Sequence, residues 1–414
     1  MRVLLSTYGS RGDVQPMAAL AVALQAHGVD VQLCAPPDQE FVALLDRAGL
    51  PLVPAFSSVR EWVAMARRAA LGLPRLAAIM VAAQFEVMAA AADGCDAIVA
   101  TGLFPSVAAA QAVAETRGIR YVFASFCPLL LPSPHHPPFE YPGQPHPPGV
   151  ADNRALWAFN VQAKNALFGE AVNSHRAAIG LPPLDNVRDQ VFKHRPWLAS
   201  DPVLSPWRAS DLVDAVQTGA WILPDQRPLP SELQAFLEAG TPPVCVGFGS
   251  MPMSASKDTA QVAIEAIRAQ GRRVLLLRGW ADLALIDDRD DCFITGEVNQ
   301  QALFGRVSAV VHHGGAGTTT AAAQAGAPQI IVPQVVDQPF WAGRVAELGI
   351  GAAHDGAIPS FDSLSAALRM ALTPETRERA AAVAGTIRSD GATVAAKLLL
   401  DDLSRACEDH RARS

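Results

Sequence analysis

The sequence predicts an α/β protein made of two tandem domains, each built on a parallel, doubly wound sheet. Short apolar runs alternate with helical stretches in the first half of the chain, and this alternation stops at proline-rich segments before it restarts in the second half. Strands that alternate with helices are typical of parallel sheets. The chain has 414 residues, of which 50% are hydrophobic, so it can form the cores of two such domains.

In the first half, we expect strands at residues 3–7, 29–35, 96–101 and 119–124, and helices at 17–26 and 106–116. The most apolar window, residues 71–92, contains Pro74, Arg75, Gln84 and Glu86, which favours a buried or groove-facing helix over a membrane span. Residues 127–149 are so rich in proline that they cannot form regular structure. A loop of this length on an α/β scaffold is often functional, and a simple surface excursion is the alternative.

A second proline-rich stretch, residues 216–231, is interpreted as a linker between an N-terminal domain at 1–215 and a C-terminal domain at 232–390. Beyond it, we expect strands at 243–248, 273–278, 292–295, 309–312 and 329–332, with helices at 257–269 and 318–325. The chain becomes helical from Pro374, and a last helix at 393–405 lies within a C-terminal segment, 391–414. Two such domains leave a cleft at the carboxyl ends of their strands, where ligands bind in this class of fold.

Composition excludes several classes of partner. The formal net charge is -7 and there is no long run of Lys or Arg, so nucleic acid is not expected as a partner. The six cysteines are scattered and form no CxxC pair, which is typical of reduced thiols in a cytoplasmic protein. A strand begins almost at the N-terminus, so we expect no signal peptide and no stable membrane insertion.

The strongest local motif is "VVHHGGAGTTT", residues 310–320. A strand, a glycine turn and a helix N-terminus form an anion site, because free N–H groups and the positive end of the helix dipole face the same place. A diphosphate fits this arrangement, and the alternative is a glycine-rich turn that only packs a helix on a sheet. One histidine is expected to contact the ligand and the other to be structural, without a choice between them. The candidate ligand residues are His312, His313, Gly314, Gly315, Gly317 and Thr318.

Three further segments lie at expected strand ends. "GFGSM", residues 247–251, makes Ser250 a second phosphate candidate, although a glycine turn alone is a weak signal. "VVDQP", residues 335–339, places Asp337 beside Gln338, which suits a ligand rich in hydroxyls; Asp337 could instead cap a helix that starts near Pro339. The acidic run 287–291 is interpreted as a solvated turn, so no metal site is predicted.

The loop after the first strand, "STYGSRGDVQP" at residues 6–16, combines groups that suit a phosphate with one that does not. Its glycines, serine and arginine are typical of an anion-binding loop. Asp13 adds a negative charge, which such a loop should not contain. Near the N-terminus of a helix expected to begin around Pro16, this carboxylate is held ionised and could accept a proton, or it could simply cap the helix.

Together, "HHGGAGTT", "DQP", "GSRGDVQP" and "GEVNQQALF" (residues 296–304) resemble family 1 glycosyltransferases of the GT-B fold. The closest likeness is to bacterial enzymes that glycosylate antibiotic scaffolds, especially glycopeptide aglycones. The resemblance implies two tandem Rossmann-like domains that face each other across a cleft, with a C-terminal helix that crosses back to the N-terminal domain. Sterol and polyketide glycosyltransferases of the same fold, a non-catalytic GT-B-like auxiliary protein and a nucleotide-sugar epimerase are the alternatives.

The resemblance also assigns roles to residues. Asp13 would be the general base of an inverting reaction that needs no metal and no cofactor, and the donor would be a TDP- or UDP-sugar. The helix dipole, backbone N–H groups and imidazole would stabilise the leaving diphosphate in place of a cation. The remaining positions follow from the same likeness: Ser10, Arg11 and Gly12 near the diphosphate, Ser250, His312 and the backbone of 314–318 on the diphosphate, Val298 and Gln301 at the nucleobase, and Asp337 and Gln338 on the sugar.

The resemblance places a large hydrophobic or aromatic acceptor on the N-terminal domain. Phe56, Trp62, Phe126, Phe139 and Tyr141 are the residues that could face it, and a place in the core is the alternative for each. The protein is expected to be a monomer or a weak dimer.

Overall fold

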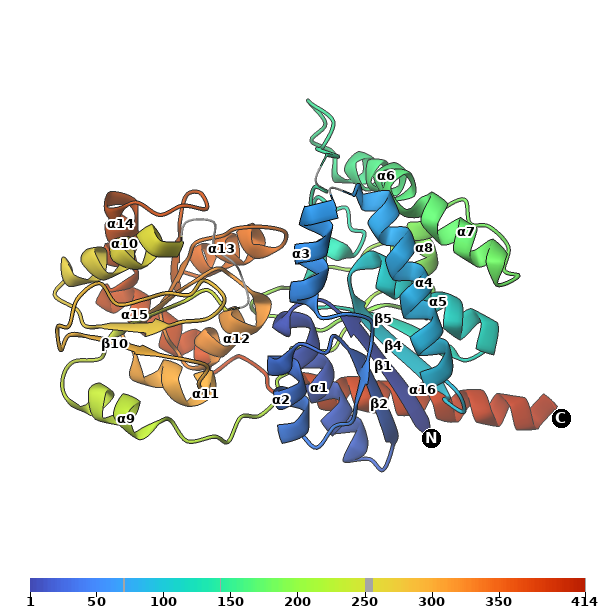
Figure 1. The fold of residues 1–414 in the computed structure, drawn as a ribbon, viewed down its shortest axis with the longest axis horizontal. Coiled ribbons are helices and arrows are strands. Elements are labelled where there is room, and N and C mark those ends of the chain that lie inside the picture. The colour runs from blue at the N-terminus through green and yellow to red at the C-terminus, as the bar shows by residue number, and fades with distance from the viewer. Residues whose placement is uncertain (70, 142, 250–255, 414) are drawn as a thin grey trace. The chain divides into compact units, whose positions relative to one another are not determined.

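The structure is a computed structural model, and it describes residues 1–69, 71–141, 143–249 and 256–413. The chain divides into two compact units (Figure 1). Unit 1 comprises residues 1–202, 207–223 and 389–414, and unit 2 comprises residues 203–206 and 224–388. Each unit contains one parallel sheet with helices between its strands, so the predicted fold class is confirmed.

Unit 1 contains a seven-stranded parallel sheet in the order β3-β2-β1-β4-β5-β6-β7. Its strands are β1 (Arg2–Tyr8), β2 (Asp30–Ala35), β3 (Leu52–Pro54), β4 (Ala97–Gly102), β5 (Arg120–Ser125), β6 (Trp197–Leu198) and β7 (Val216–Gln217). Its helices are α1 (Arg11–Gln25), α2 (Gln39–Arg47), α3 (Val59–Ala69), α4 (Leu73–Ala91), α5 (Phe104–Arg117), α6 (Asn153–Lys164), α7 (Glu170–Ala178), α8 (Val187–Val191) and α16 (Gly391–Arg413), with a 3-10 turn at Pro128–Leu130 and a π-helical turn at Asn165–Gly169.

Unit 2 contains a six-stranded parallel sheet in the order β10-β9-β8-β11-β12-β13. Its strands are β8 (Val244–Gly247), β9 (Val274–Leu277), β10 (Cys292–Thr295), β11 (Ala309–His312), β12 (Gln329–Ile331) and β13 (Gly351–Ala353). Its helices are α9 (Ser231–Glu238), α10 (Ser256–Arg268), α11 (Gln300–Leu303), α12 (Ala316–Gln324), α13 (Gln338–Glu347), α14 (Phe361–Ala371) and α15 (Pro374–Ala384), with a 3-10 turn at Phe304–Arg306.

The strand order reverses direction once in each sheet, and these reversals position the candidate sites. In unit 1 the reversal lies between β1 and β4, and in unit 2 it lies between β8 and β11. Loops at the carboxyl ends of such neighbouring strands diverge and leave a crevice for ligands. Asp13 lies in the first turn of α1, the helix that follows β1, and the His-Gly motif follows β11, so both motifs lie at the topological switch points.

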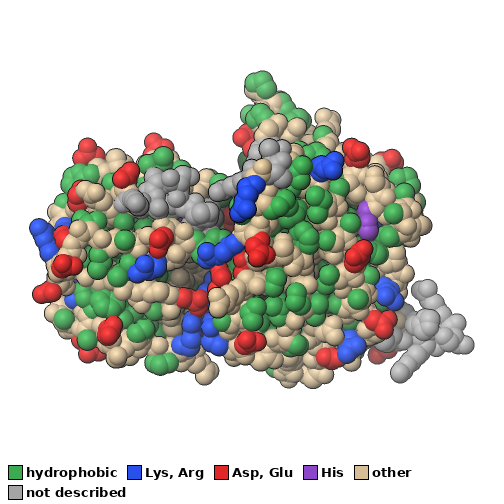
Figure 2. Space-filling model, in the orientation of Figure 1, with side chains coloured by type: hydrophobic (Ala, Val, Ile, Leu, Met, Phe, Trp, Pro, Cys, Tyr) green, Lys and Arg blue, Asp and Glu red, His purple; other side chains and the backbone are tan. Residues whose placement is uncertain are grey.

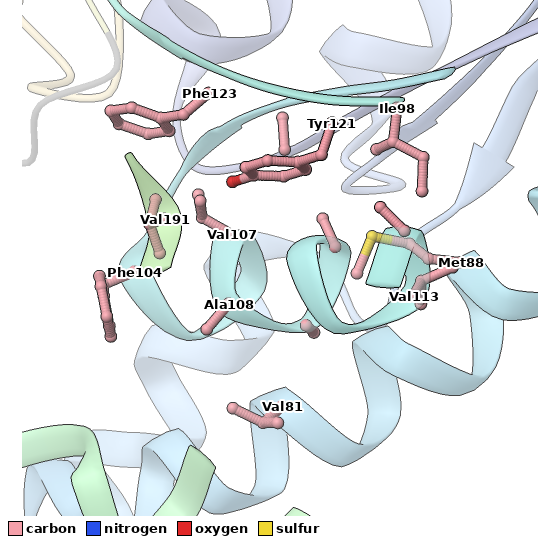
Figure 3. Packing of buried hydrophobic residues seen from close by; sticks show 14 of the residues in the cluster. Val81, Met88, Ile98, Phe104, Val107, Ala108, Val113, Tyr121, Phe123 and Val191 are labelled. Atoms are coloured by element: carbon pink, nitrogen blue, oxygen red, sulfur yellow. The ribbon is translucent and has the colours of Figure 1, made fainter. Parts of the chain in front are cut away.

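The core of unit 1 explains why the apolar window at 71–92 is a helix of a folded domain. In Figure 3, Val81 and Met88 of α4 point toward α5, whose Val107 and Val113 lie beneath Tyr121 of β5. By length and composition, α4 is the one described helix that could cross a membrane. Because its inner face packs in this core, we interpret it as a core helix that is exposed on its other side. On the face drawn in Figure 2, acidic and basic side chains are interspersed among apolar ones.

The start of α1 and the position of the linker differ from the sequence-based expectation. Helix α1 begins at Arg11 rather than around Pro16, because Ser10 caps it and Pro16 is accommodated inside the helix. The expected linker at 216–231 begins within the sheet, since Val216 and Gln217 pair with β6 as an edge strand, and the chain passes to unit 2 at Pro224.

The C-terminal helix α16 belongs to unit 1, where it lies along α1 (Figure 1). Its Asp402 carboxylate pairs with Arg120 of β5 at 2.6 Å. Ala395, Ala396 and Leu399 are fully buried on its inner face. The prediction that this helix returns to the N-terminal domain is confirmed.

Candidate functional site

The His-Gly loop of unit 2 leaves the N-terminus of α12 open. Gly315 occupies the N-cap position, and as a glycine it has no side chain to accept a hydrogen bond from the first turn. The backbone N–H groups of that turn have no partner within the helix, so they and the helix dipole can bind an anion. Thr319 and Thr320 turn their hydroxyls back to the carbonyls of Gly315 and Ala316, at 2.9 and 2.8 Å.

His312 supports this loop from inside the unit. The side chain is fully buried, and its Nε2 donates to Oε1 of Gln329 at 2.9 Å. Its Nδ1 accepts the backbone N–H of Gly314 at 3.1 Å, so the ring is neutral with its proton on Nε2. Burial lowers the pKa of His312 to about 3. The amide nitrogen of Gln329 in turn donates to the carbonyl of Thr319, which ties the loop to α12.

His313 lies on the loop side. A Cβ atom at Gly315 would lie 2.7 Å from its Nε2, and one at Gly249 would lie 3.3 Å from its Cε1, so only glycine leaves room for this ring at both positions. Its Nδ1 is buried and makes no hydrogen bond to the described residues. Burial lowers the pKa of His313 to about 4, so this ring is also neutral at pH 7. Ser250, the neighbouring candidate, lies outside the described residues.

The Asp-Gln segment lies against the His-Gly loop. Gly314 has a φ of +92°, and a Cβ atom there would lie 2.6 Å from Cγ2 of Ile331 and 3.2 Å from the carbonyl oxygen of Gln338. Asp337 is at the N-cap position of α13, but it makes no capping hydrogen bond, unlike the capping role considered for it. Its Oδ2 accepts the indole N–H of Trp341 at 2.8 Å. Burial raises the pKa of Asp337, and the Trp341 hydrogen bond opposes that rise.

Gln338 is buried, and its side-chain oxygen is occupied by the loop before it. Oε1 accepts the backbone N–H of Gln334 at 2.7 Å and that of Val335 at 3.1 Å. The pair therefore offers an oxygen of Asp337 and the amide nitrogen of Gln338 to a ligand.

The expected nucleobase contacts lie together but have different surroundings. Val298 is part of the unit 2 core, with its side chain packed near Leu229 and Leu303, so only its backbone is available to a ligand. Gln301 is exposed, and its Oε1 accepts the backbone N–H of Asp225 at 3.3 Å. Asn299 between them donates to the carbonyl of Asp225 at 2.7 Å.

In unit 1, Asp13 closes a capping box at the start of α1. Its Oδ2 accepts the backbone N–H of Ser10 at 2.8 Å, while Ser10 Oγ accepts the N–H of Gly12 at 3.2 Å. A Cβ atom at Gly9 would collide with this carboxylate and displace it from the cap. The Arg11 Nε donates to Gln15 at 2.9 Å. The capping role considered for Asp13 is thus present, and one carboxylate oxygen serves it.

Several of the five aromatic candidates for the acceptor face pack against other residues of unit 1. Trp62 is 7% exposed and packs with Tyr8 and Phe56, so it belongs to the core. Phe126 packs edge-on against Trp221, and Tyr141 packs against the main core of unit 1. Phe139 packs against Tyr141 with tilted rings and 4.6 Å between ring centroids. The sequence did not point to Gln329 or Trp341, whose roles depend on partners in other elements.

Two family descriptions match the chain. Residues 3–123 match the glycosyltransferase family 28 N-terminal domain, and residues 290–397 match the erythromycin biosynthesis protein CIII-like C-terminal domain. Among curated proteins, the chain is 57% identical over 401 residues to glycosyltransferase GtfE of Amycolatopsis orientalis, covering 96% of this chain and 97% of the relative. It is 56% identical to the vancomycin aglycone glucosyltransferase and 50% identical to the dTDP-epi-vancosaminyltransferase of the same organism, with 98% of each chain covered.

Solved structures share the fold at low identity. The glycosyltransferase of kitacinnamycin matches with a TM-score of 0.71 and 20% identity, covering 97% of this chain and 99% of its own. The glycosyltransferase VinC, solved in complex with DTDP, matches with a TM-score of 0.68 and 20% identity, covering 98% of this chain and 100% of its own.

Proposed function

Because the chain belongs to the GT-B glycosyltransferases that include the glycopeptide antibiotic enzymes, we propose that it transfers a sugar from a TDP- or UDP-sugar to a glycopeptide aglycone. The acceptor group would be a hydroxyl of the aglycone or of a partly glycosylated intermediate. Relatives with this activity in their names support the acceptor class, and the VinC complex with DTDP supports a nucleotide-linked donor.

The observation that carries the proposal is the open N-terminus of α12 beside two neutral histidines. The residues from His312 to Thr318 include no Lys or Arg, so within this loop the diphosphate would be bound by N–H groups and the helix dipole. Such fixed donors stabilise the charge that develops on the leaving group, and we therefore propose that the reaction requires no metal and no cofactor.

We assign the general base to Asp13. The acceptor O–H transfers its proton to the carboxylate while its oxygen attacks the anomeric carbon, and the bond from that carbon to the diphosphate breaks. Attack on the face opposite the leaving group inverts the configuration at that carbon. Asp13 lies in the first turn of α1, where the helix dipole favours the ionised form. The carboxylate that closes the cap through Oδ2 would also accept the proton.

We place the reaction in the cytoplasm, with a monomer or weak dimer as the active form. The five described cysteines at 34, 95, 127, 245 and 292 are free and buried thiols, as in a reducing compartment.

Mass spectrometry of products tests the activity. TDP- and UDP-sugars are offered separately to purified protein with glycopeptide aglycones, and a mass increase of one sugar is expected. Donor bound without transfer to any acceptor would favour an auxiliary protein, and a changed sugar in the absence of acceptor would favour an epimerase. Both results would contradict the proposal.

Two substitutions separate the base from the cap at Asp13. An amide oxygen in Asp13→Asn can still accept the Ser10 N–H, whereas Asp13→Ala loses both the cap and the base. If Asp13 is the base, both variants lose turnover by a factor of about 10² to 10⁴ while TDP binding is kept. If Asp13 only caps α1, Asp13→Asn keeps its rate. Ser360→Ala, in the capping box of α14, controls for the stability lost with a cap.

A further inference from the structure

Asp337 is turned away from the helix that follows it. The backbone of this N-cap residue is helical, with φ of -91° and ψ of -8°, rather than extended as in most N-caps. Its carboxylate accepts nothing from the first turn of α13. Instead, Oδ2 accepts the indole N–H of Trp341, four residues further along, at 2.8 Å. Trp341 is 1% exposed, so close packing holds the donor in place.

Among the described residues, Trp341 is the one side chain that donates to this carboxylate. Asp337 is half-buried, and a carboxylate can accept more than one hydrogen bond, so it has capacity for a further donor that approaches from its exposed side. A sugar hydroxyl is such a donor. The site thus has an oxygen whose direction is set by the indole and whose partner is absent from the described chain.

The Gln338 side chain is held by the backbone of the preceding loop. Both groups that bond its Oε1 are backbone N–H donors, so the oxygen must face the loop at Gln334 and Val335. The amide nitrogen of Gln338 is therefore the atom of this side chain that can donate to a ligand.

We propose that Trp341 is a positioning residue for sugar recognition, holding the Asp337 carboxylate so that its second oxygen accepts a hydroxyl of the transferred sugar. This inference rests on the proposed function of the site. It adds to that function a residue outside the Asp-Gln pair, since the direction of the Asp337 carboxylate is set by the Trp341 indole.

The test is Trp341→Phe, which keeps a ring in the core and removes the N–H. Steady-state kinetics are measured with a fully hydroxylated nucleotide sugar and with deoxy donors that each lack one hydroxyl. We expect kcat/KM for the full donor to fall about tenfold, because a hydrogen bond to a charged group is lost. For the donor that lacks the hydroxyl read by Asp337, the fall should be less than twofold. The affinity for TDP alone should also change less than twofold.

A double-mutant cycle supplies the second readout. In the Asp337→Ala background, Trp341→Phe should have no further effect on kcat/KM, since the two residues act through one contact. Trp221→Phe is the matched control, because that indole is 4% exposed and donates to Thr218 Oγ1 at 3.0 Å in unit 1. It should reproduce any general loss of stability without changing the ratio of kcat/KM between donors.

Failure of the Trp341 inference can be distinguished from failure of the proposed function. An equal loss on all donors, additive with Asp337→Ala, would overturn the inference and make Trp341 a packing residue. The ratio between donors does not depend on the folded fraction, so a destabilised variant remains informative. If no folded Trp341→Phe is obtained, Trp341→His is measured instead, because it keeps a ring N–H. We then expect it to keep part of the ratio of kcat/KM between the full donor and the donor that lacks the hydroxyl read by Asp337. Equal kcat/KM for the two donors would overturn the inference. Failure of the unaltered protein to transfer any sugar would instead refute the proposed function.

Discussion

Replacing His312 by Asn and by Gln tests whether this histidine supports the His-Gly loop from inside or contacts the ligand that we propose for it. The two amides each reproduce one half of the imidazole. Asn places an oxygen near the position of Nδ1, where it can accept the Gly314 N–H. Gln extends an amide nitrogen toward the position of Nε2, where it can donate to Gln329.

The magnitude follows from burial. His312 is fully buried, so each lost hydrogen bond leaves a desolvated partner, at about 1–3 kcal/mol each. Both variants should therefore unfold at lower urea concentration. Only His312→Gln leaves the Gly314 N–H unpaired, and this glycine lies in the His-Gly loop that we propose binds the diphosphate. We expect the Kd for TDP to rise about tenfold in the Gln variant, equivalent to about 1.4 kcal/mol, and less than threefold in the Asn variant.

Isothermal calorimetry with TDP and urea unfolding are the assays. His354→Asn is the matched control, because His354 is also buried in unit 2 and bonds through both nitrogens, to the carbonyl of Gly356 at 2.9 Å and to Ser363 Oγ at 2.8 Å. It should lower stability without changing TDP affinity. An equal loss of affinity in both His312 variants, without loss of stability, would refute the supporting role and indicate direct contact with the diphosphate.

Two further predictions concern stability. Gly314→Ala should lower the urea midpoint and weaken TDP binding, because φ is +92° and the new Cβ would lie 2.6 Å from Ile331. The control is Gly317→Ala, which should keep or raise the midpoint because no atom lies within 4 Å of its Cβ. Equal urea midpoints for the two variants would contradict this prediction. Burial lowers the pKa of Lys164 to about 7 from 10.5, so between these values the unfolded chain carries a proton that the folded chain lacks. Stability should therefore rise with pH across this window, and Lys164→Met should flatten the slope measured by urea unfolding. An unchanged slope would show that the nearby Phe104 ring, 4.2 Å from Nζ, keeps the lysine charged.

The sequence predicted the fold and the loops because those depend on local patterns. The period of apolar residues placed β11 and β12 within one residue of their observed ends. Gly314, which needs a left-handed backbone and lies against Gln338, marked the His-Gly loop from its residue type alone. Loops at the carboxyl ends of parallel strands meet at one edge of the sheet, so order along the chain was sufficient to group them.

What the sequence could not predict was the choice between chemically equivalent neighbours. His312 and His313 are adjacent and identical, and what distinguishes their roles is Gln329, which lies one strand away. The start of α1 was placed too late because Pro16 suggested a first turn. The helix begins five residues earlier, at Arg11, where Ser10 and Asp13 form the capping box. Short edge strands such as β7 have too few residues to show a period, and they form because β6 offers a pairing edge.

The network around His312 also explains why two neutral histidines suit this site better than charged ones. A charged imidazole at His312 would be buried, and desolvation of the charge costs free energy. This cost is the main reason why the pKa of His312 is low. The neutral ring instead accepts from Gly314, so its lone pair fixes the direction of a backbone N–H in the loop. Donors fixed in this way need no reorganisation as charge develops on a leaving diphosphate. The same logic applies to Asp337 and Gln338, whose polar atoms are held by Trp341 and by the 334–335 backbone. Both loops therefore use buried, neutral contacts to orient the groups that we propose bind the donor.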